Sequence, residues 1–176
     1  ADSFGKGAYI TKATVQLMRD LGSIQAPQNA FLINLGLETL ALRVKKHCEN
    51  ALKIAQYLSE SPYVSWVNYP SLKGNKYYES AQKYMPNGSC GVLTFGVNGG
   101  RAAAIKFMDS LRLAAIVTHV ADTRTSVLHP ASTTHRQLTD EQLVAAKITP
   151  DLMRFSIGIE DADDLIADIE QALRII

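Results

Sequence analysis

The sequence predicts an α/β fold in which a small sheet is covered by helices and one long helix precedes it. Strand and helix patterns alternate from residue 62 onward, and this alternation is typical of a sheet covered by helices. Between Gln28 and Leu58, apolar residues recur at steps of three and four, as they do on one face of a helix. We therefore expect two parts, residues 1–60 and residues 61–176, of which the second is a small α/β domain.

The composition is that of an ordinary globular chain. The 176 residues are 47% hydrophobic and 20% charged, with a net charge of +1. So small a charge gives no basic surface for nucleic acid, and no apolar run approaches the roughly 18 residues of a membrane span. We expect no nucleic-acid or membrane partner and no secretory leader, and the two scattered cysteines, Cys48 and Cys90, favour a reducing, cytoplasmic location. Cys90 precedes an apolar run, where a buried filler is favoured over a nucleophile.

The first 60 residues have helical patterns. Apolar residues that fit one helix face are Ala13, Leu17, Met18 and Leu21. Gly22 is placed to end that helix. A single helix over residues 28–58 would exceed the common length, so we expect it to join two lobes or to break in the middle.

The remaining elements follow in alternation. Strands are expected over residues 64–69, 90–97, 113–117, 126–128 and 152–159. Helices are expected over residues 75–84 and 100–111, in a short segment that starts at Thr139, and from Asp161 to Leu173. Thr139 and Gln142 have the spacing of a capping box. We expect the acidic run 160–164 to stabilise the start of the last helix, because carboxylates complement the helix dipole there.

One arginine, Arg154, lies inside the most apolar strand pattern. A buried guanidinium needs an anionic partner, because an unpaired buried charge is costly. Arginine is also the side chain best shaped to hold a carboxylate through two parallel hydrogen bonds. On the residues alone two partners remain open: the carboxylate of an amino-acid ligand, or an internal Asp or Glu.

Two histidines, His129 and His135, flank a short run of hydroxyl side chains. Such a group would suit a metal site or a nucleophile with its base. However, a spacing of six residues without a third ligand is poor for a metal, and no glycine elbow surrounds Ser132. The pattern therefore favours a structural role, and we expect no metal site.

The sequence resembles the Cys/Met-metabolism enzymes that depend on pyridoxal phosphate (PLP), and most closely their O-acetylhomoserine sulfhydrylase branch. Segments 126–135 and 152–161 carry the resemblance at the C-terminal end. Collinear matches upstream are residues 15–22, 29–32, 36–40, 47–51 and 91–96. The resemblance implies the C-terminal part of a fold-type I PLP enzyme, in which residues 1–60 end the PLP-binding lobe and form the linking helix. It also implies a homo-oligomer, which is a tetramer in the family.

The resemblance further implies a transferase that replaces the acetoxy group of O-acetylhomoserine with sulfide or methanethiol, giving homocysteine or methionine. A cystathionine γ-synthase or a methionine γ-lyase of the same family is the alternative enzyme, and a non-catalytic α/β ligand-binding module is the alternative of another class. The family's PLP-binding lysine, stacking tyrosine and pyridine-facing aspartate lie N-terminal to the matched region, and no lysine here sits in a matching motif. We therefore expect PLP to be bound by a missing N-terminal portion, which would be a partner of this chain. We expect no catalytic or cofactor-binding residue here.

The resemblance also implies the substrate-binding residues. Arg154 stands in the motif that holds the amino-acid substrate's α-carboxylate in the family. Residues 118–125 match a loop near that carboxylate, so His119 and Val120 are predicted to contact the substrate. His119 replaces the usual Asn or Ser, and Ala121 replaces the usual Gly. A contact that shapes the pocket is favoured for His119 over a role as catalytic acid or base.

Overall fold

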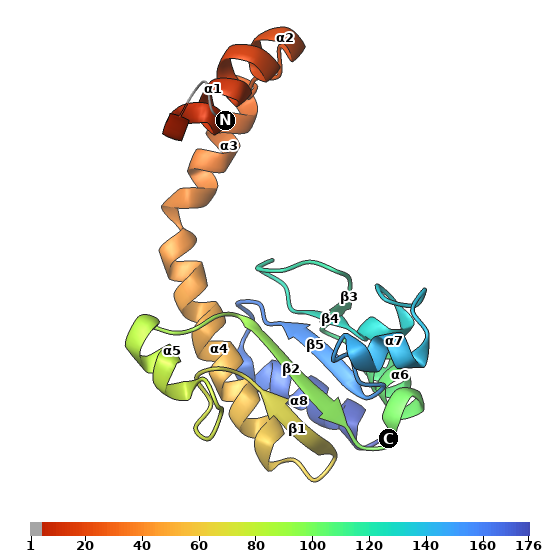
Figure 1. The fold of residues 1–176 in the computed structure, drawn as a ribbon. Helices are drawn as coiled ribbons and strands as arrows, with labels where there is room; N and C mark the ends of the chain where they lie inside the picture. The colour runs from red at the N-terminus through yellow and green to blue at the C-terminus, as the bar shows by residue number, and fades with distance from the viewer. Residues whose placement is uncertain (1–4) are drawn as a thin grey trace. The chain divides into compact units, whose positions relative to one another are not determined.

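A computed structural model describes residues 5–176 (Figure 1). The chain divides into two compact units, one that extends to Leu40 and one that covers Ala41–Ile176. The sequence prediction placed a boundary after residue 60, because it divided the chain by the expected roles of its two parts. Helix α4 (Leu40–Glu60) starts at the boundary between the units and is almost entirely part of the second. The assignment of residues 1–60 to a PLP-binding lobe and linking helix stays a prediction.

The first unit is helical. It contains a 3-10 turn at Gly5–Gly7, helix α1 (Ala8–Thr11), a π-helical stretch at Lys12–Met18, and helices α2 (Arg19–Leu21) and α3 (Pro27–Glu38). Gly22 ends the first helical run in a left-handed conformation, and its N–H donates to the carbonyl of Met18 at 2.8 Å. The helix and its stop at Gly22, both predicted from the pattern, are confirmed.

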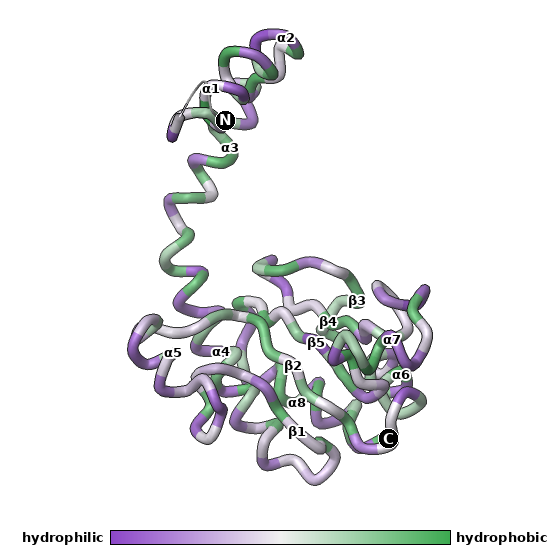
Figure 2. Tube along the Cα trace, viewed as in Figure 1, coloured by the Kyte–Doolittle hydropathy of each residue, from purple (hydrophilic) through white to green (hydrophobic). Residues whose placement is uncertain are grey.

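Apolar residues recur along the helices of the first unit (Figure 2), and their large side chains are exposed. None of the residues in the described helices of this unit is buried. The exposed ones are Tyr9, Ile10, Val15, Leu17, Met18, Leu21, Ile24, Phe31, Leu32, Ile33, Leu35 and Leu37. Soluble proteins rarely leave large apolar patches open to solvent.

The long helical pattern breaks at Thr39, where φ is −105° and ψ is 3°. Helix α3 ends at Glu38 and α4 begins at Leu40, so the expected break in the middle of the pattern is confirmed. One face of α4 is buried in the second unit. Its buried residues are His47, Cys48, Asn50, Ala51, Ile54, Ala55 and Leu58.

The second unit is built on a five-stranded sheet. Its strands are β1 (Val64–Asn68), β2 (Val92–Val97), β3 (Ala115–Ile116), β4 (Ser126–Leu128) and β5 (Leu152–Ser156). Their order is β1-β2-β5-β4-β3, in which β3 and β4 are parallel and the other neighbours are antiparallel. The five predicted strands are all present, although β3 and β5 are shorter than the apolar pattern indicated.

Helices cover the sheet on one side, and α4 and α8 lie behind it in Figure 1. The helices after α4 are α5 (Tyr78–Tyr84), α6 (Gly100–Ser110), α7 (Asp140–Ala145) and α8 (Ala162–Leu173), with a 3-10 turn at Pro130–Ser132. Both bonds of the predicted capping box between Thr139 and Gln142 are present, and the Asp161 side chain caps α8. No helix in the described part of the chain has the length and apolar character that a membrane crossing requires.

The core lies between the sheet and the helices α4, α6 and α8. Phe95 of β2, Phe107 of α6 and Phe155 of β5 form an aromatic cluster with ring centroids 5.2 to 6.2 Å apart. Because side chains alternate along a strand, Met153 and Phe155 are fully buried in this core, while Arg154 between them faces the other side of the sheet. The helices thus leave the face with Arg154 for other contacts.

We expect the substitution Phe155→Ala to destabilise the second unit by roughly 3–5 kcal/mol, because it removes a fully buried ring and leaves a cavity. Urea unfolding can be followed by the fluorescence of Trp66, the only tryptophan of the chain. The matched control is Leu113→Ala, whose side chain is 51% exposed and whose loss should change stability by about 0.5 kcal/mol or less. A similar small change for Phe155→Ala would contradict the described core.

Candidate functional site

The face of the sheet opposite α4, α6 and α8 carries Arg154 and, on its β2 side, a row of polar side chains. In the strand register, Arg154 of β5 stands beside Thr94 of β2 on one side and Leu128 of β4 on the other. Asn68 of β1 follows next to Thr94 and extends the row. The position of Arg154 is therefore fixed by the alternation of β5, which buries its two neighbours in the core.

The Arg154 guanidinium has few partners. Its Nη2 donates to the carbonyl oxygen of Thr118 at 3.3 Å, and its buried Nε has no hydrogen-bond partner. None of the ion pairs within residues 5–176 involves Arg154. The internal ion pair that the sequence left open is therefore absent from the described part of the chain. A buried donor on a cation costs free energy while it is unpaired, so the site favours an anion supplied from outside these residues.

Residues 118–125 form a loop that is tied to the sheet next to Arg154. The first tie is the bond from Arg154 to the carbonyl of Thr118. The hydroxyl of Ser126 donates to the carbonyl of His119 at 3.0 Å, and the backbone N–H of Ala121 donates to the hydroxyl of Ser156 at 3.1 Å. Side chains of strands β4 and β5 thus fix the position of the loop through these three hydrogen bonds.

The two other predicted substrate contacts, His119 and Val120, lie on this loop and are exposed, with 57% of Val120 accessible. His119 lines a small cavity of about 70 Å³ under the loop together with Asp122 and Arg124, but Val120 and Arg154 do not line it. A hydrogen bond from the N–H of Arg124 is the main cause that lowers the pKa of the Asp122 carboxyl below its usual value. Of the loop residues, Thr118 bonds to Arg154. His119 and Val120 follow Thr118 in the sequence, and the side chains of both are exposed to solvent.

Ala121 has an unusual backbone conformation with φ of 60°. This left-handed region crowds the Cβ of an L-residue, so glycine is the residue that adopts it without strain. The alanine that replaces the family's usual glycine therefore keeps the conformation that a glycine would adopt.

The far end of the loop is held by Glu160. Its carboxylate accepts from the N–H of Thr125 at 2.5 Å and from the hydroxyl of Thr125 at 2.9 Å. For Glu160 the prediction of a helix-start role was wrong, because its side chain points to Thr125, whereas Asp161 caps α8 as predicted. Sequence reasoning missed the roles of Thr125, Glu160 and Ser156. Thr125 bonds to Glu160 and Ser156 bonds to Ala121, and each of these bonds connects residues that lie 35 positions apart in the sequence.

Helix α4 supports the segment that carries Glu160. His47 donates from Nδ1 to the carbonyl of Ile157 at 2.6 Å. The side-chain amide of Asn50 donates to the carbonyls of Gly158 at 3.1 Å and Glu160 at 2.8 Å. These bonds explain why β5 ends at Ser156 although the apolar pattern continues to Ile159, because the backbone after Ser156 turns to α4.

His129 has the structural role that its pattern favoured. It is fully buried, its Nε2 donates to the carbonyl of Pro150 at 2.8 Å, and its Nδ1 accepts from the hydroxyl of Ser132 at 2.7 Å. The imidazole thus connects the 3-10 turn at Pro130–Ser132 to the loop before β5. Burial lowers the pKa of His129, which keeps this ring neutral. Among residues 5–176 no group of three possible metal ligands occurs.

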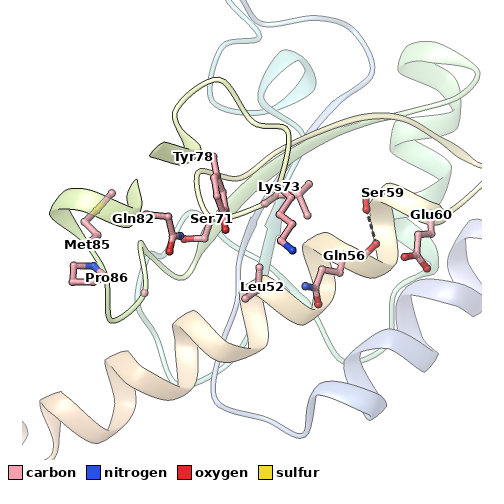
Figure 3. Close-up of a pocket in the computed structure, with 12 residues that line it drawn as sticks. Leu52, Gln56, Ser59, Glu60, Ser71, Lys73, Tyr78, Gln82, Met85 and Pro86 are labelled. Atoms are coloured by element: carbon pink, nitrogen blue, oxygen red, sulfur yellow. Dashed lines mark hydrogen bonds between the residues drawn. The ribbon is translucent and has the colours of Figure 1, made fainter. Parts of the chain in front are cut away.

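Arg154 does not line the cleft that lies between α4 and α5. The cleft has a volume of about 560 Å³ and separates α4 from α5 (Figure 3). Gln56 and Glu60 of α4, Lys73, and Tyr78 and Gln82 of α5 contribute polar groups to it. None of the predicted site residues lines this cleft.

The surroundings of the lysines decide which part of a PLP site this chain can supply. A lysine that bonds PLP needs a desolvated pocket. Every lysine of the chain is exposed except Lys46, which is half-buried. The residues described here therefore do not fit the covalent cofactor site. Arg154 instead fits the carboxylate of an amino acid.

The second unit is thus a helix-covered sheet that holds Arg154, without an ion-pair partner among the described residues, beside the 118–125 loop. A profile of the Cys/Met metabolism PLP-dependent enzymes matches residues 4–174. The chain belongs to this family.

Relatives of known name agree with this assignment. The chain is 46% identical over 179 residues to the homocysteine/cysteine synthase of Kluyveromyces lactis, with 96% of this chain and 40% of that protein covered. It is 44% identical over 172 residues to O-acetyl-L-homoserine sulfhydrylase 1 of Thermus thermophilus, with 98% and 41% covered. The chain therefore spans about two fifths of the length of these relatives.

A solved structure shows the same fold. It is the crystal structure of an O-acetylhomoserine (thiol)-lyase from Campylobacter jejuni that carries a pyridoxyl-lysine at its position 205. The TM-score is 0.87 at 40% identity, and 98% of this chain and 41% of that chain are covered. The predicted fold class, the C-terminal part of a PLP enzyme with a small helix-covered sheet, is confirmed.

We expect the stability of the second unit to fall as the pH falls below about 6.5, the ordinary pKa of an unfolded histidine, because His129 binds a proton more readily when unfolded. The stabilisation that comes from neutral His129 is complete above about pH 6.5. It is lost as the pH falls toward the lower pKa of His129 in the folded state. The measurement compares thermal midpoints of the wild type and His129→Gln between about pH 5 and 8. Parallel curves for the two proteins would show that His129 is not the titrating group.

We expect Ala121→Gly to stabilise the chain by roughly 0.5–1 kcal/mol. Release of the left-handed strain gives about 1–2 kcal/mol, which exceeds the roughly 0.5–1 kcal/mol of added unfolded-state entropy. The matched control is Ala102→Gly on the exposed side of α6, which should cost about 1 kcal/mol in a right-handed helix. Chemical unfolding measures both, and a loss of stability at both positions would rule out strain at Ala121.

Proposed function

We propose that the chain is the C-terminal part of a PLP-dependent transferase that replaces the acetoxy group of O-acetylhomoserine with sulfide or methanethiol and forms homocysteine or methionine. The observation that carries the proposal is the Arg154 guanidinium, which has no carboxylate partner within the described residues. The names of the relatives, homocysteine synthases and O-acetylhomoserine sulfhydrylases, support the same substrate class.

In this proposal Arg154 holds the α-carboxylate of the amino-acid substrate. The carbonyl of Thr118 uses one of the five N–H donors of the guanidinium, so a parallel pair remains for a carboxylate. A bidentate contact fixes direction as well as distance, and fixed direction is what a reaction at a neighbouring carbon requires. His119 and Val120 line the substrate pocket, since they are the exposed residues that follow Thr118.

The cofactor is PLP, bound by a lysine outside these 176 residues. When bound, PLP supplies an electron sink for the reacting amino acid. The residues of this chain bind and orient the substrate and close one side of its pocket. Their fit to a carboxylate, together with the exposed positions of the lysines, supports this division of labour.

The partners in this proposal are the N-terminal portion of the same enzyme and further copies of the enzyme, which form a homotetramer. The exposed apolar side chains of α1 to α3 support it, because they offer a surface that another polypeptide segment can cover. We also propose a cytoplasmic location, in line with the free thiols of Cys48 and Cys90.

The experiment is a kinetic assay of the full-length enzyme with PLP, O-acetylhomoserine and either sulfide or methanethiol. We expect turnover with these substrates and a loss of roughly 10–100-fold in kcat/KM for Arg154→Lys. Lysine keeps the charge but loses the planar fork, and one charge-assisted hydrogen bond contributes about 1.5–3 kcal/mol. Thermal midpoints should change much less than the kinetics.

The matched control is Arg174→Lys, since Arg174 is exposed and pairs only with Glu170 of the preceding turn. It should keep the kcat/KM of the wild type. A wild-type enzyme that cleaves the amino acid without a sulfur acceptor would point to a lyase instead. A value for Arg154→Lys within about twofold of the wild type would remove Arg154 from the carboxylate site.

A further inference from the structure

A group of buried hydrogen bonds centred on Thr125 fixes the C-terminal end of the 118–125 loop. Thr125 is 1% exposed. The N–H and the hydroxyl of Thr125 both donate to the Glu160 carboxylate. The same hydroxyl accepts from the N–H of Gly158 at 2.9 Å, and the carbonyl of Thr125 accepts from the N–H of Ala115 at 2.9 Å. Every polar atom of Thr125 is therefore bonded to a segment outside the loop.

We infer that Thr125 and Glu160 are positioning residues for substrate binding, an inference that rests on the proposed function. Their bonds set where the loop leaves the sheet. Through the carbonyl of Thr118 at its other end, the loop in turn sets the direction of the Arg154 guanidinium. Neither Thr125 nor Glu160 is placed to touch the substrate carboxylate itself.

The hydrogen bonds around Thr125 leave little room for the loop to move. A Cβ at Gly158 would collide with the Glu160 carboxylate and with the backbone of Thr123 and Thr125. The N–H of Ile159 also donates to the carbonyl of Thr123 at 2.9 Å. The loop therefore rests directly on the backbone that follows β5. Because an error of about 1 Å in substrate position can cost 100-fold in rate, this close contact matters for binding.

The negative charge of the Glu160 carboxylate makes the hydrogen bonds around Thr125 strong. A carboxylate accepts from both Thr125 donors at once, and hydrogen bonds to a charged group are shorter and stronger than neutral ones. A glutamine at position 160 has the same size, but its amide has one acceptor oxygen in place of two, so it can accept only one of the two Thr125 bonds. Glu160→Gln thus removes the charge and one hydrogen bond without leaving a cavity.

The test uses the full-length enzyme with PLP and the variants Glu160→Gln, Thr125→Val and Thr125→Ser. For the first two we expect kcat/KM for O-acetylhomoserine to fall by roughly tenfold or more, mainly through a higher KM. Thr125→Ser keeps the hydroxyl and should stay within about threefold of the wild type. The neighbouring control is Asp161→Asn, which removes one charge but keeps a good helix cap and does not touch the loop.

Hydrogen exchange of the backbone amides of residues 118–125 gives a second readout that needs no activity. We expect faster exchange in Glu160→Gln and Thr125→Val, and wild-type exchange in Thr125→Ser and Asp161→Asn. If Glu160→Gln does not fold, the comparison of Thr125→Val with Thr125→Ser tests the same hydrogen bonds. Unchanged exchange and KM in Thr125→Val would overturn the inference, even where the wild type is active. An inactive wild type with faster loop exchange in Thr125→Val would reject the proposed function alone.

Discussion

The hydrogen bonds between the Glu160 carboxylate and Thr125 determine how the candidate site is assembled. They join the start of α8 to the end of the loop before β4, two segments that the sequence separates by 35 residues. Because both donors of Thr125 point into one carboxylate, the loop has a single way to leave the sheet. The position of Thr118 beside Arg154 follows from that path.

Helix α4 makes this arrangement rigid. Its apolar side packs in the core, and the polar side chains of His47 and Asn50 at the same buried face hold the carbonyls of Ile157, Gly158 and Glu160. His47 Nδ1 and the Asn50 amide nitrogen thus bond to backbone carbonyls that no strand pairs, whereas the buried His47 Nε2 has no partner among the described residues. The helix therefore both completes the core and carries the segment on which the loop rests.

The sequence predicted what depends on neighbouring residues. The capping box at Thr139 and the cap at Asp161 involve partners within three residues, and the apolar pattern around Arg154 predicted the strand β5. The end of β5 was predicted too late, because Ile157 and Ile159 continue the apolar pattern after the strand pairing has stopped. The role of Glu160 could not be found in this way, since an acidic residue before a helix has a local explanation that hides a distant partner.

The proposed role of Arg154 shows how a binding residue would differ from a residue that only stabilises the fold. A guanidinium with an unpaired, buried Nε costs stability in the free chain, whereas a well-packed apolar residue on the same strand would not. The core, the hydrogen bonds from α4 and the Thr125–Glu160 bonds stabilise this region and offset that cost. In the proposed function, a ligand carboxylate pairs with the guanidinium and offsets its desolvation free energy. The unpaired guanidinium of the free site therefore favours binding of an anion.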